Sequence, residues 1–202
     1  MLRAPPGSRT RPTSDRVREA MFDVLGSVLG ADGLQGADVV DLFAGSGALG
    51  IEALSRGAAS AVFVERDRRA AAAVSANLSA LGMSALATVV QADAVSWLAG
   101  PGGEHAFGLA FCDPPYVFDG WAALLGRLRA EVAVLESDRP LELPASWNVL
   151  KTKRYGGTLV TVVQVATSPG AAPRCGTAPA LPASGHLPGT DGECGVAEGG
   201  ST

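Results

Sequence analysis

The residues best suited to chemistry in this sequence are Asp113-Pro114-Pro115-Tyr116, which follow an apolar run at 107–112. The prolines fix the turn and lack N–H groups, so the turn presents acceptors: the Asp113 carboxylate and the Pro114 carbonyl. A nucleobase NH₂ group offers two N–H donors to such a pair, which directs its nitrogen lone pair at an electrophile. Tyr116 adds a flat face for a base to stack on. The pattern predicts chemistry on an exocyclic amine; a proline turn with a capping aspartate is the alternative.

A second site is predicted at Asp41, Phe43, Gly45 and Gly47, an Asp-x-Phe-x-Gly-x-Gly turn between a β-branched apolar run and a helical apolar pattern. Glycines there permit unusual backbone angles and let a ligand approach the main chain. The chain lacks Gly-Lys-Ser/Thr, which excludes a P-loop. Asp41 would repel a diphosphate and suits a cationic ligand, such as the amino acid end of S-adenosylmethionine. A turn that binds nothing is the alternative.

Two further carboxylates follow strand-like runs. Glu65 ends the run 60–65 and lies twenty residues beyond Gly45, the spacing at which an acidic residue binds ribose hydroxyls in doubly wound folds. Asp93 comes shortly after the run 86–90. Together with the aspartate of the glycine turn, these carboxylates would line one edge of a parallel sheet, where ligands bind. Three independent helix caps are the alternative.

Strand-like and helix-like patterns alternate along the chain. We expect helices at 15–29, 48–56, 67–81 (capped by Asp67) and 120–130, and strands at 38–43, 60–65, 86–90, 107–112, 132–136, 149–153 and 158–165. This alternation predicts an α/β fold with right-handed crossovers. The sheet would be seven-stranded and mostly parallel, with helices on both faces and a C-terminal antiparallel hairpin.

The length, composition and charge of the chain restrict its domain organisation and its possible partners. The chain has 202 residues, of which 47% are hydrophobic, enough for one domain with extras. A net charge of −4 excludes a uniformly basic nucleic-acid binder. Arg11, Arg16 and Arg18 form a basic patch that could face phosphates; arginines that are merely solvated are the alternative. We expect three regions: an irregular basic segment at 1–13, the domain at 14–166, and a disordered tail at 167–202.

The three cysteines, Cys112, Cys175 and Cys194, are spaced neither as a disulfide framework nor as a zinc site. No apolar run reaches the roughly 18 residues of a transmembrane helix, and the N-terminus lacks the apolar segment of a signal peptide. We therefore expect a cytoplasmic monomer that needs no metal and associates with no membrane.

Several motifs together carry a resemblance to a known family. They are Asp41–Gly50 (Asp-Leu-Phe-Ala-Gly-Ser-Gly-Ala-Leu-Gly), Val62–Asp67 (Val-Phe-Val-Glu-Arg-Asp), Asp113–Tyr116, Arg11–Glu19 and Lys153–Gly156. The first three resemble the S-adenosylmethionine-dependent amino-methyltransferases, which have a Rossmann-like class I fold. The last two narrow the resemblance to the RsmD family, which methylates the N2 amine of one guanine in bacterial 16S ribosomal RNA. The resemblance covers about residues 10–165.

This resemblance implies a direct in-line methyl transfer. Asp113 and the Pro114 carbonyl would accept the N2 hydrogens of a guanine that stacks on Tyr116. Glu65 would bind the cofactor ribose and Asp93 the adenine amine. The whole set that would bind S-adenosyl-L-methionine is Asp41, Phe43, Gly45, Gly47, Glu65, Arg66, Asp93 and Ala94. The basic patch, Arg11, Arg16 and Arg18, would contact phosphates of 16S ribosomal RNA in the small ribosomal subunit or an assembly intermediate.

Two other functions fit the same residues. One is an amino-methyltransferase acting on DNA adenine, another RNA base or a glutamine amide. The other is a non-catalytic RNA-binding assembly module that keeps a cofactor pocket. Members of the RsmD family usually begin with a basic β-hairpin, whereas only ten residues precede Arg11 here. We therefore expect either a start further upstream or the loss of part of the RNA-docking surface.

Overall fold

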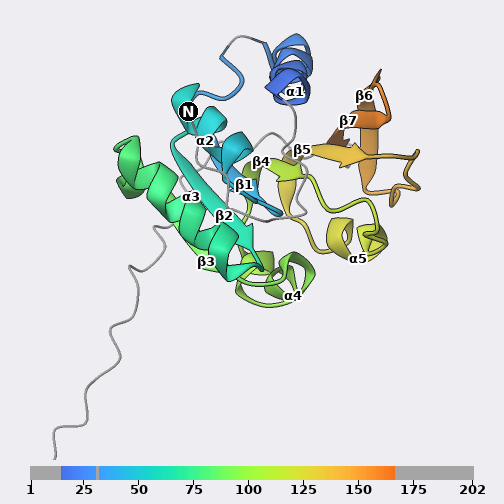
Figure 1. Cartoon of the computed structure of the whole chain (residues 1–202). Helices are drawn as coiled ribbons and strands as arrows, with labels where there is room; N and C mark the ends of the chain where they lie inside the picture. The colour runs from blue at the N-terminus through green and yellow to red at the C-terminus, as the bar shows by residue number, and fades with distance from the viewer. Residues whose placement is uncertain (1–14, 31, 167–202) are drawn as a thin grey trace, which may run out of the picture.

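The computed structural model describes residues 15–30 and 32–166, and the segments predicted to be irregular or disordered at 1–13 and 167–202 lie outside them. The elements in chain order are α1 (Asp15–Leu29), β1 (Asp38–Asp41), α2 (Ala48–Ser55), β2 (Ser60–Glu65), α3 (Arg68–Ala80), the 3₁₀ turn η1 (Ser84–Leu86), β3 (Ala87–Gln91), α4 (Ala94–Leu98), η2 (Pro101–Glu104), β4 (Phe107–Cys112), α5 (Trp121–Leu125), β5 (Ala130–Ser137), β6 (Trp147–Tyr155) and β7 (Thr158–Val165) (Figure 1).

All seven of these strands form one sheet in the order β3-β2-β1-β4-β5-β7-β6. The first five strands pair in parallel, and the β6–β7 hairpin joins β5 antiparallel through β7. The strand order reverses between β1 and β4. In an open α/β sheet, ligands bind at the carboxyl ends of the strands beside such a switch point. The predicted fold class is therefore confirmed, and it places the glycine turn and the Asp-Pro-Pro-Tyr loop next to each other.

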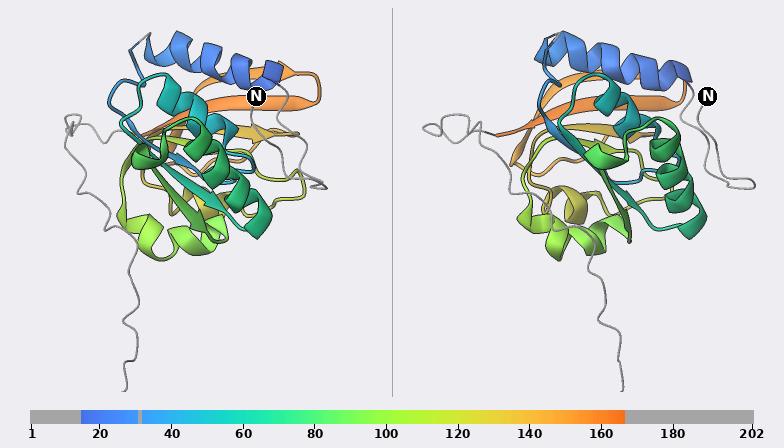
Figure 2. Two further views of the ribbon diagram at one scale, coloured as in Figure 1. Left: turned by 60° about the vertical axis from the view of Figure 1, so that its left-hand side comes forward. Right: turned by 90° about the vertical axis from the view of Figure 1, so that its left-hand side faces the viewer.

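Helices cover both faces of the sheet, which Figures 1 and 2 show from three sides. One apolar cluster joins α1, α2 and α3 to one face, and a second joins α4 and α5 to the other. Neighbouring strand residues alternate between the two clusters: Val39 belongs to the first and Val40 to the second. Because successive side chains of a strand point to opposite faces, a sheet buried on both faces needs continuous apolar strands.

All predicted elements except one have the expected bounds within two residues. The first strand stops at Asp41 rather than at residue 43, because Leu42 and Phe43 already belong to the turn that leads to the glycines. The helix expected at 120–130 covers only Trp121–Leu125. Gly126 ends it, since glycine is a poor helix former. The chain must then enter β5 at Ala130, which pairs with β4.

The closing hairpin is longer than predicted on its first strand. β6 begins at Trp147, whose buried indole N–H donates to the carbonyl of Leu125 at 3.1 Å. Gly156 has a φ of +61° and forms the turn that returns the chain into β7. Within residues 15–30 and 32–166, none of the helices combines the length and apolar character that crossing a membrane requires.

Candidate active site

The turn between β1 and α2 depends on glycine at two positions. Gly45 and Gly47 have φ values of +55° and +83°, in the left-handed region that other residues avoid. A Cβ on Gly47 would lie 3.1 Å from Val74, 3.2 Å from Ile51 and 3.4 Å from Phe63. The turn therefore packs tightly on its inner side and has no room there for another side chain.

Two side chains hold this turn from neighbouring elements. Glu65, at the end of β2, accepts the Gly45 N–H through Oε2 and the Asp67 N–H through Oε1, both at 2.8 Å. Asn77 of α3 is buried, and its Nδ2 donates to the carbonyl of Ser46 at 2.9 Å. Because a carboxylate has about four lone-pair positions, Glu65 keeps acceptor capacity for a ribose hydroxyl. That binding role stays a prediction.

Asp41 lies below the turn and is 1% exposed. Its Oδ2 accepts the Gly50 N–H at 3.1 Å, and its Oδ1 is buried with no hydrogen-bond partner among the described residues. The pKa of Asp41 is raised from 3.8 to about 7, mainly by burial and to a smaller extent by the charges of Asp113 and Glu65, while backbone hydrogen bonds, chiefly from Gly50, oppose the rise. A buried carboxylate without a full set of partners is costly in its charged form. A cation held beside it would remove that cost.

The other predicted cofactor residues lie at the ends of β2 and β3. Asp93 is the N-cap of α4 and accepts the Ser96 N–H at 2.9 Å, so its side chain does cap a helix. Ala94 is buried in the first turn of that helix, and Arg66 is exposed. The contact of Asp93 with the adenine amine, and of Arg66 and Ala94 with the cofactor, stays a prediction.

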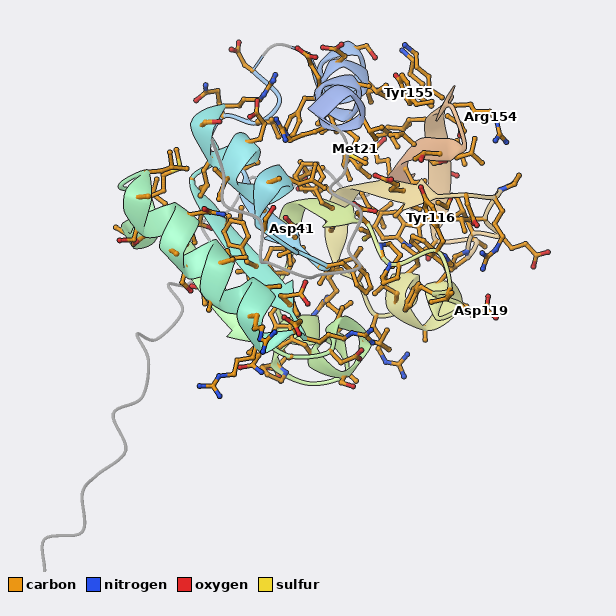
Figure 3. The ribbon with its side chains drawn as sticks, viewed as in Figure 1. Met21, Asp41, Tyr116, Asp119, Arg154 and Tyr155 are labelled. Carbon is orange, nitrogen blue, oxygen red and sulfur yellow. The ribbon has the colours of Figure 1, made fainter. Side chains whose placement is uncertain are left out.

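The Asp-Pro-Pro-Tyr loop lies directly beside the glycine turn. β1 pairs with β4 through Asp41 and Phe111, and the Leu42 N–H donates to the Phe111 carbonyl at 3.0 Å. The ring of Phe43 contacts the edge of Phe118, with centroids 5.2 Å apart. These contacts place the two motifs side by side at the switch point; Figure 3 labels Asp41 of the turn and Tyr116 of the loop.

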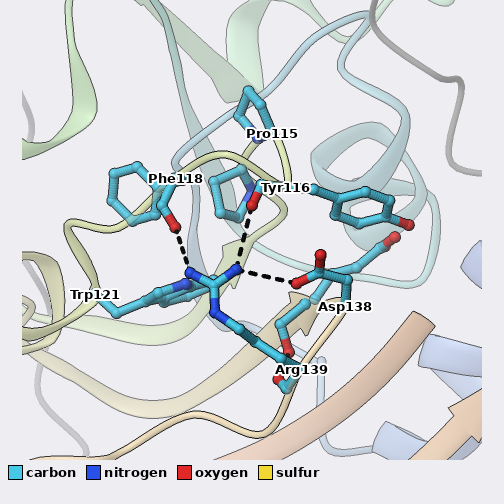
Figure 4. Close-up of a pocket in the computed structure, with 9 residues that line it drawn as sticks. Pro115, Tyr116, Phe118, Trp121, Asp138 and Arg139 are labelled. Carbon is cyan, nitrogen blue, oxygen red and sulfur yellow. Dashed lines mark hydrogen bonds and ion pairs between the residues drawn. The ribbon is translucent and has the colours of Figure 1, made fainter. Parts of the chain in front are cut away.

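Arg139, which follows β5, holds the loop from outside (Figure 4). Its Nη1 donates to the carbonyl of Tyr116 and its Nη2 to that of Phe118, both at 3.3 Å. Ion pairs with Asp119 at 2.9 Å and Asp138 at 3.1 Å orient the guanidinium. The arginine therefore holds two carbonyls of the loop with one planar group.

Tyr116 is linked to the hairpin on its other side. Its hydroxyl lies 2.9 Å from Oγ1 of Thr158, the first residue of β7. The small cavity behind the loop, lined by Pro114, Tyr116, Trp121 and Arg139 among others, has a volume of about 10 Å³. That is room for one water molecule at most. A base would therefore have to meet the solvent-facing side of Tyr116.

The thiol next to the site, Cys112, is not suited to act as a nucleophile. Cys112 is buried next to Asp113, and burial raises the pKa of its thiol well above the usual range, with Asp41 and Asp113 adding to the rise. A thiol that stays protonated is a poor nucleophile. Within the described part of the chain, no group of His, Cys, Asp and Glu is arranged to hold a metal ion.

The predicted RNA-binding arginines are only partly described. Arg11 lies outside the described residues, the backbone of Arg16 belongs to α1 without a described side chain, and Arg18 is half-buried. The hairpin adds exposed cations, Lys153 and Arg154, on the outer strand β6. Nothing described here tests their contact with RNA.

Three side chains that shape the site were not predicted: Asn77, Arg139 and Thr158. The burial of Asn77 could have been predicted from the sequence, since it stands three residues after Val74 in the buried stripe of α3. A polar residue at such a position needs a buried partner. No sequence pattern indicated the roles of Arg139 and Thr158, because their partners in the loop lie about 20 and 42 residues away in the chain.

Comparison with known proteins gives the family. The family profile described as conserved hypothetical protein 95 matches residues 1–164. A candidate rRNA methyltransferase of Bacillus subtilis, YlbH, is 40% identical over 172 residues, covering 80% of this chain and 91% of that protein. Ribosomal RNA small subunit methyltransferase D of Escherichia coli is 37% identical over 167 residues, covering 77% of this chain and 79% of that protein.

A solved structure shares the fold. The Thermus thermophilus 16S rRNA N2 G1207 methyltransferase RsmC, solved with AdoMet and guanosine, superposes with a TM-score of 0.61 at 25% identity. The match covers 80% of this chain and 46% of that one. The profile match over most of the chain, and two relatives above 30% identity, show that this protein belongs to the conserved hypothetical protein 95 family, the family of the small subunit methyltransferases D.

Proposed function

We propose that this protein methylates the exocyclic N2 amine of a guanine in 16S ribosomal RNA. Membership of its family makes it an S-adenosylmethionine-dependent RNA methyltransferase. The observation that best supports the choice of an amine as acceptor is the position of the Asp-Pro-Pro-Tyr loop. It borders the glycine turn across the β1–β4 switch point, with Asp113 close enough to Asp41 to raise the pKa of that carboxyl.

The residues of the turn fit the cofactor. The buried Oδ1 of Asp41 has no described hydrogen-bond partner and suits the cationic amino acid end of S-adenosylmethionine. Gly45 and Gly47 leave the main chain open to a ligand. Glu65, the last residue of β2, would bind the ribose, and Asp93, two residues after β3, would bind the adenine. When bound, the cofactor supplies an electrophilic methyl group.

The loop supplies what the acceptor needs. The Asp113 carboxylate and the Pro114 carbonyl accept the two N–H groups of the guanine amine, which fixes the direction of its lone pair. Tyr116 stacks on the unstacked base. As the nitrogen gains positive charge in the transition state, the carboxylate stabilises that charge. Orientation of the two reactants accounts for much of the remaining rate enhancement.

The choice of N2 of guanine is supported by the relatives. The Thermus protein with the same fold is named as an N2 guanine methyltransferase, and its structure contains guanosine. We propose the small ribosomal subunit or an assembly intermediate as the substrate particle, and a cytoplasmic monomer without a metal as the active form. Lys153, Arg154 and Arg18, together with Arg11 and Arg16, would contact phosphates and set the register of the RNA.

The test is methylation of small subunits from a strain that lacks the family's enzyme. Purified protein and radiolabelled S-adenosylmethionine are added, the RNA is digested, and the labelled nucleoside is identified. We expect N2-methylguanosine. Label in another nucleoside, or in a protein glutamine, would refute the proposed acceptor. Turnover that is absent although RNA still binds would favour the non-catalytic assembly module.

Asp113→Ala tests the role of the loop in the same assay. The substitution removes the carboxylate that stabilises the charge on the amine, so we expect turnover to fall about a hundredfold or more. Affinity for S-adenosylmethionine, measured by calorimetry, should change little. Asp23→Ala, at an exposed position of α1, is the matched control and should keep full activity. Turnover retained by Asp113→Ala would exclude Asp113 from catalysis.

A further inference from the structure

Three consecutive apolar residues, Pro115, Tyr116 and Val117, are exposed at the rim of the site. Val117 is 92% exposed and Tyr116 38%. A run of exposed apolar residues does not stabilise the fold by burial and favours self-association. Such a run is therefore typical of a surface that contacts another molecule. Tyr116 is already assigned to the target base, whereas Val117 has no assigned role.

Val117 is held outward by the backbone on both sides of it. Arg139 binds the carbonyls of Tyr116 and Phe118, which flank Val117, at 3.3 Å each. The Phe118 N–H donates to the carbonyl of Pro115 at 2.8 Å, which closes the turn. The Phe118 ring contacts Phe43 and Trp121. These contacts fix the turn on both sides of Val117, and its side chain is 92% exposed.

The neighbourhood of Val117 indicates what it meets. The Tyr116 ring is tied to Thr158 at the start of β7. Exposed Lys153 and Arg154 lie on β6, near the turn that joins it to β7. Cations suit RNA phosphates, so the exposed apolar side chain next to the Tyr116 platform lies where the strand that carries the target base would approach.

We infer that Val117 packs against the nucleobase adjacent to the target guanine, in the space that the target leaves when it moves onto Tyr116. This inference rests on the proposed function. Extracting a base from its stack costs a few kcal/mol, because its neighbours lose a partner. Proteins that unstack nucleic acids commonly insert an apolar side chain as a replacement partner. Val117, 92% exposed at the rim of the loop, is placed to act in this way.

The experiment compares Val117→Ser, Val117→Leu and the control Val149→Ser in the full chain. Val149 is also an exposed valine, at 55%, but lies on β6 away from the loop. Two measurements are made on each variant: kcat/KM for methylation of small subunits that lack the mark, and the Kd of a fluorescein-labelled single-stranded oligoribonucleotide by anisotropy. Affinity for S-adenosylmethionine is measured in parallel and should be unchanged in all three variants.

We expect Val117→Ser to lower kcat/KM about tenfold and to weaken oligoribonucleotide binding, because the contact buries an apolar side chain. Val117→Leu should keep at least about half of the activity, since a larger apolar group still packs on a base. Val149→Ser should match the wild type. The inference is overturned if Val117→Ser is equal to the wild type in both measurements, if Val117→Leu fails as badly as the serine variant, or if Val149→Ser loses as much.

The same design separates this inference from the proposed function. If wild-type protein labels no small subunits, the proposed function fails, and the anisotropy series still decides whether Val117 contacts RNA. If the wild type is active and Val117→Ser does not differ from it, only the inference about Val117 fails.

Discussion

The glycine turn after β1 and the Asp-Pro-Pro-Tyr loop after β4 are neighbours in space, but they are held in different ways. The turn is fixed from inside, by the buried groups Asp41 and Asn77 and by Glu65. The loop contacts Thr158 and Phe43 through Tyr116 and Phe118, but its carbonyls are held from outside, by Arg139, whose side chain is 45% exposed. Loss of a buried hydrogen bond destabilises the fold, because it leaves a polar group unpaired, whereas exposed ion pairs contribute little to stability. Substitutions in the turn should therefore lower the stability of the fold and the affinity for the cofactor. Substitutions in the loop should impair only the binding and methylation of RNA.

The largest effect is expected from the buried carboxylate of the turn. Because the pKa of Asp41 in the folded protein is about 7, above its ordinary value of 3.8, the folded state holds a proton that the unfolded state has released between those pH values. Stability from this group is therefore present below about pH 4 and is lost as the pH rises to about 7. Asp41→Asn should remove this loss, which amounts to a few kcal/mol.

Urea unfolding of both proteins from pH 4 to pH 8 checks this expectation. The variant should become more stable relative to the wild type as the pH rises, while its affinity for S-adenosylmethionine falls because the anionic partner is gone. A stability difference between the two proteins that does not change with pH would show that Asp41 is ionised throughout.

The next largest effect is expected from Gly47→Ala in the same turn. An alanine must adopt a φ near +83° and place its Cβ 3.1 Å from Val74, and the left-handed conformation alone costs about 1–2 kcal/mol. We expect a lower melting temperature and at least about tenfold weaker binding of S-adenosylmethionine. Gly82→Ala, at φ +70° with open space around it, separates the backbone strain from the crowding. Equal loss of cofactor affinity in both variants would contradict a specific role of the turn.

The smallest effect on stability is expected from Arg139→Ala in the loop. The loop loses its hold on two carbonyls, so KM for RNA should rise and kcat should fall, by about tenfold in kcat/KM. Melting temperature and affinity for S-adenosylmethionine should change little, because the ion pairs are exposed. Arg127→Ala, which removes an exposed arginine of the segment after α5, is the control. A large fall in melting temperature would show instead that Arg139 is part of the stable framework.

The sequence was sufficient to predict the turn, the loop and most of the alternation of strands and helices, because each depends on neighbours in the chain; the short helix α4 was not predicted. Asp67 caps α3 as predicted, since its side chain accepts from residues two and three positions later. Arg139 could not be predicted, because its partners in the loop are set by the pairing of β4 with β5. The shortness of α5 was missed because the apolar pattern continues past Gly126 into residues that join β5.

The position of β6 at the outer end of the sheet has a separate consequence. The backbone N–H and C=O groups on its free edge could pair with the same strand of another copy. The exposed side chains of Val149 and Leu150 would add apolar contacts to that pairing. Lysine and arginine on an edge strand oppose such pairing through mutual repulsion. Lys151, Lys153 and Arg154 would therefore keep molecules apart when no nucleic acid is present, and preparations in which these charges are neutralised should aggregate.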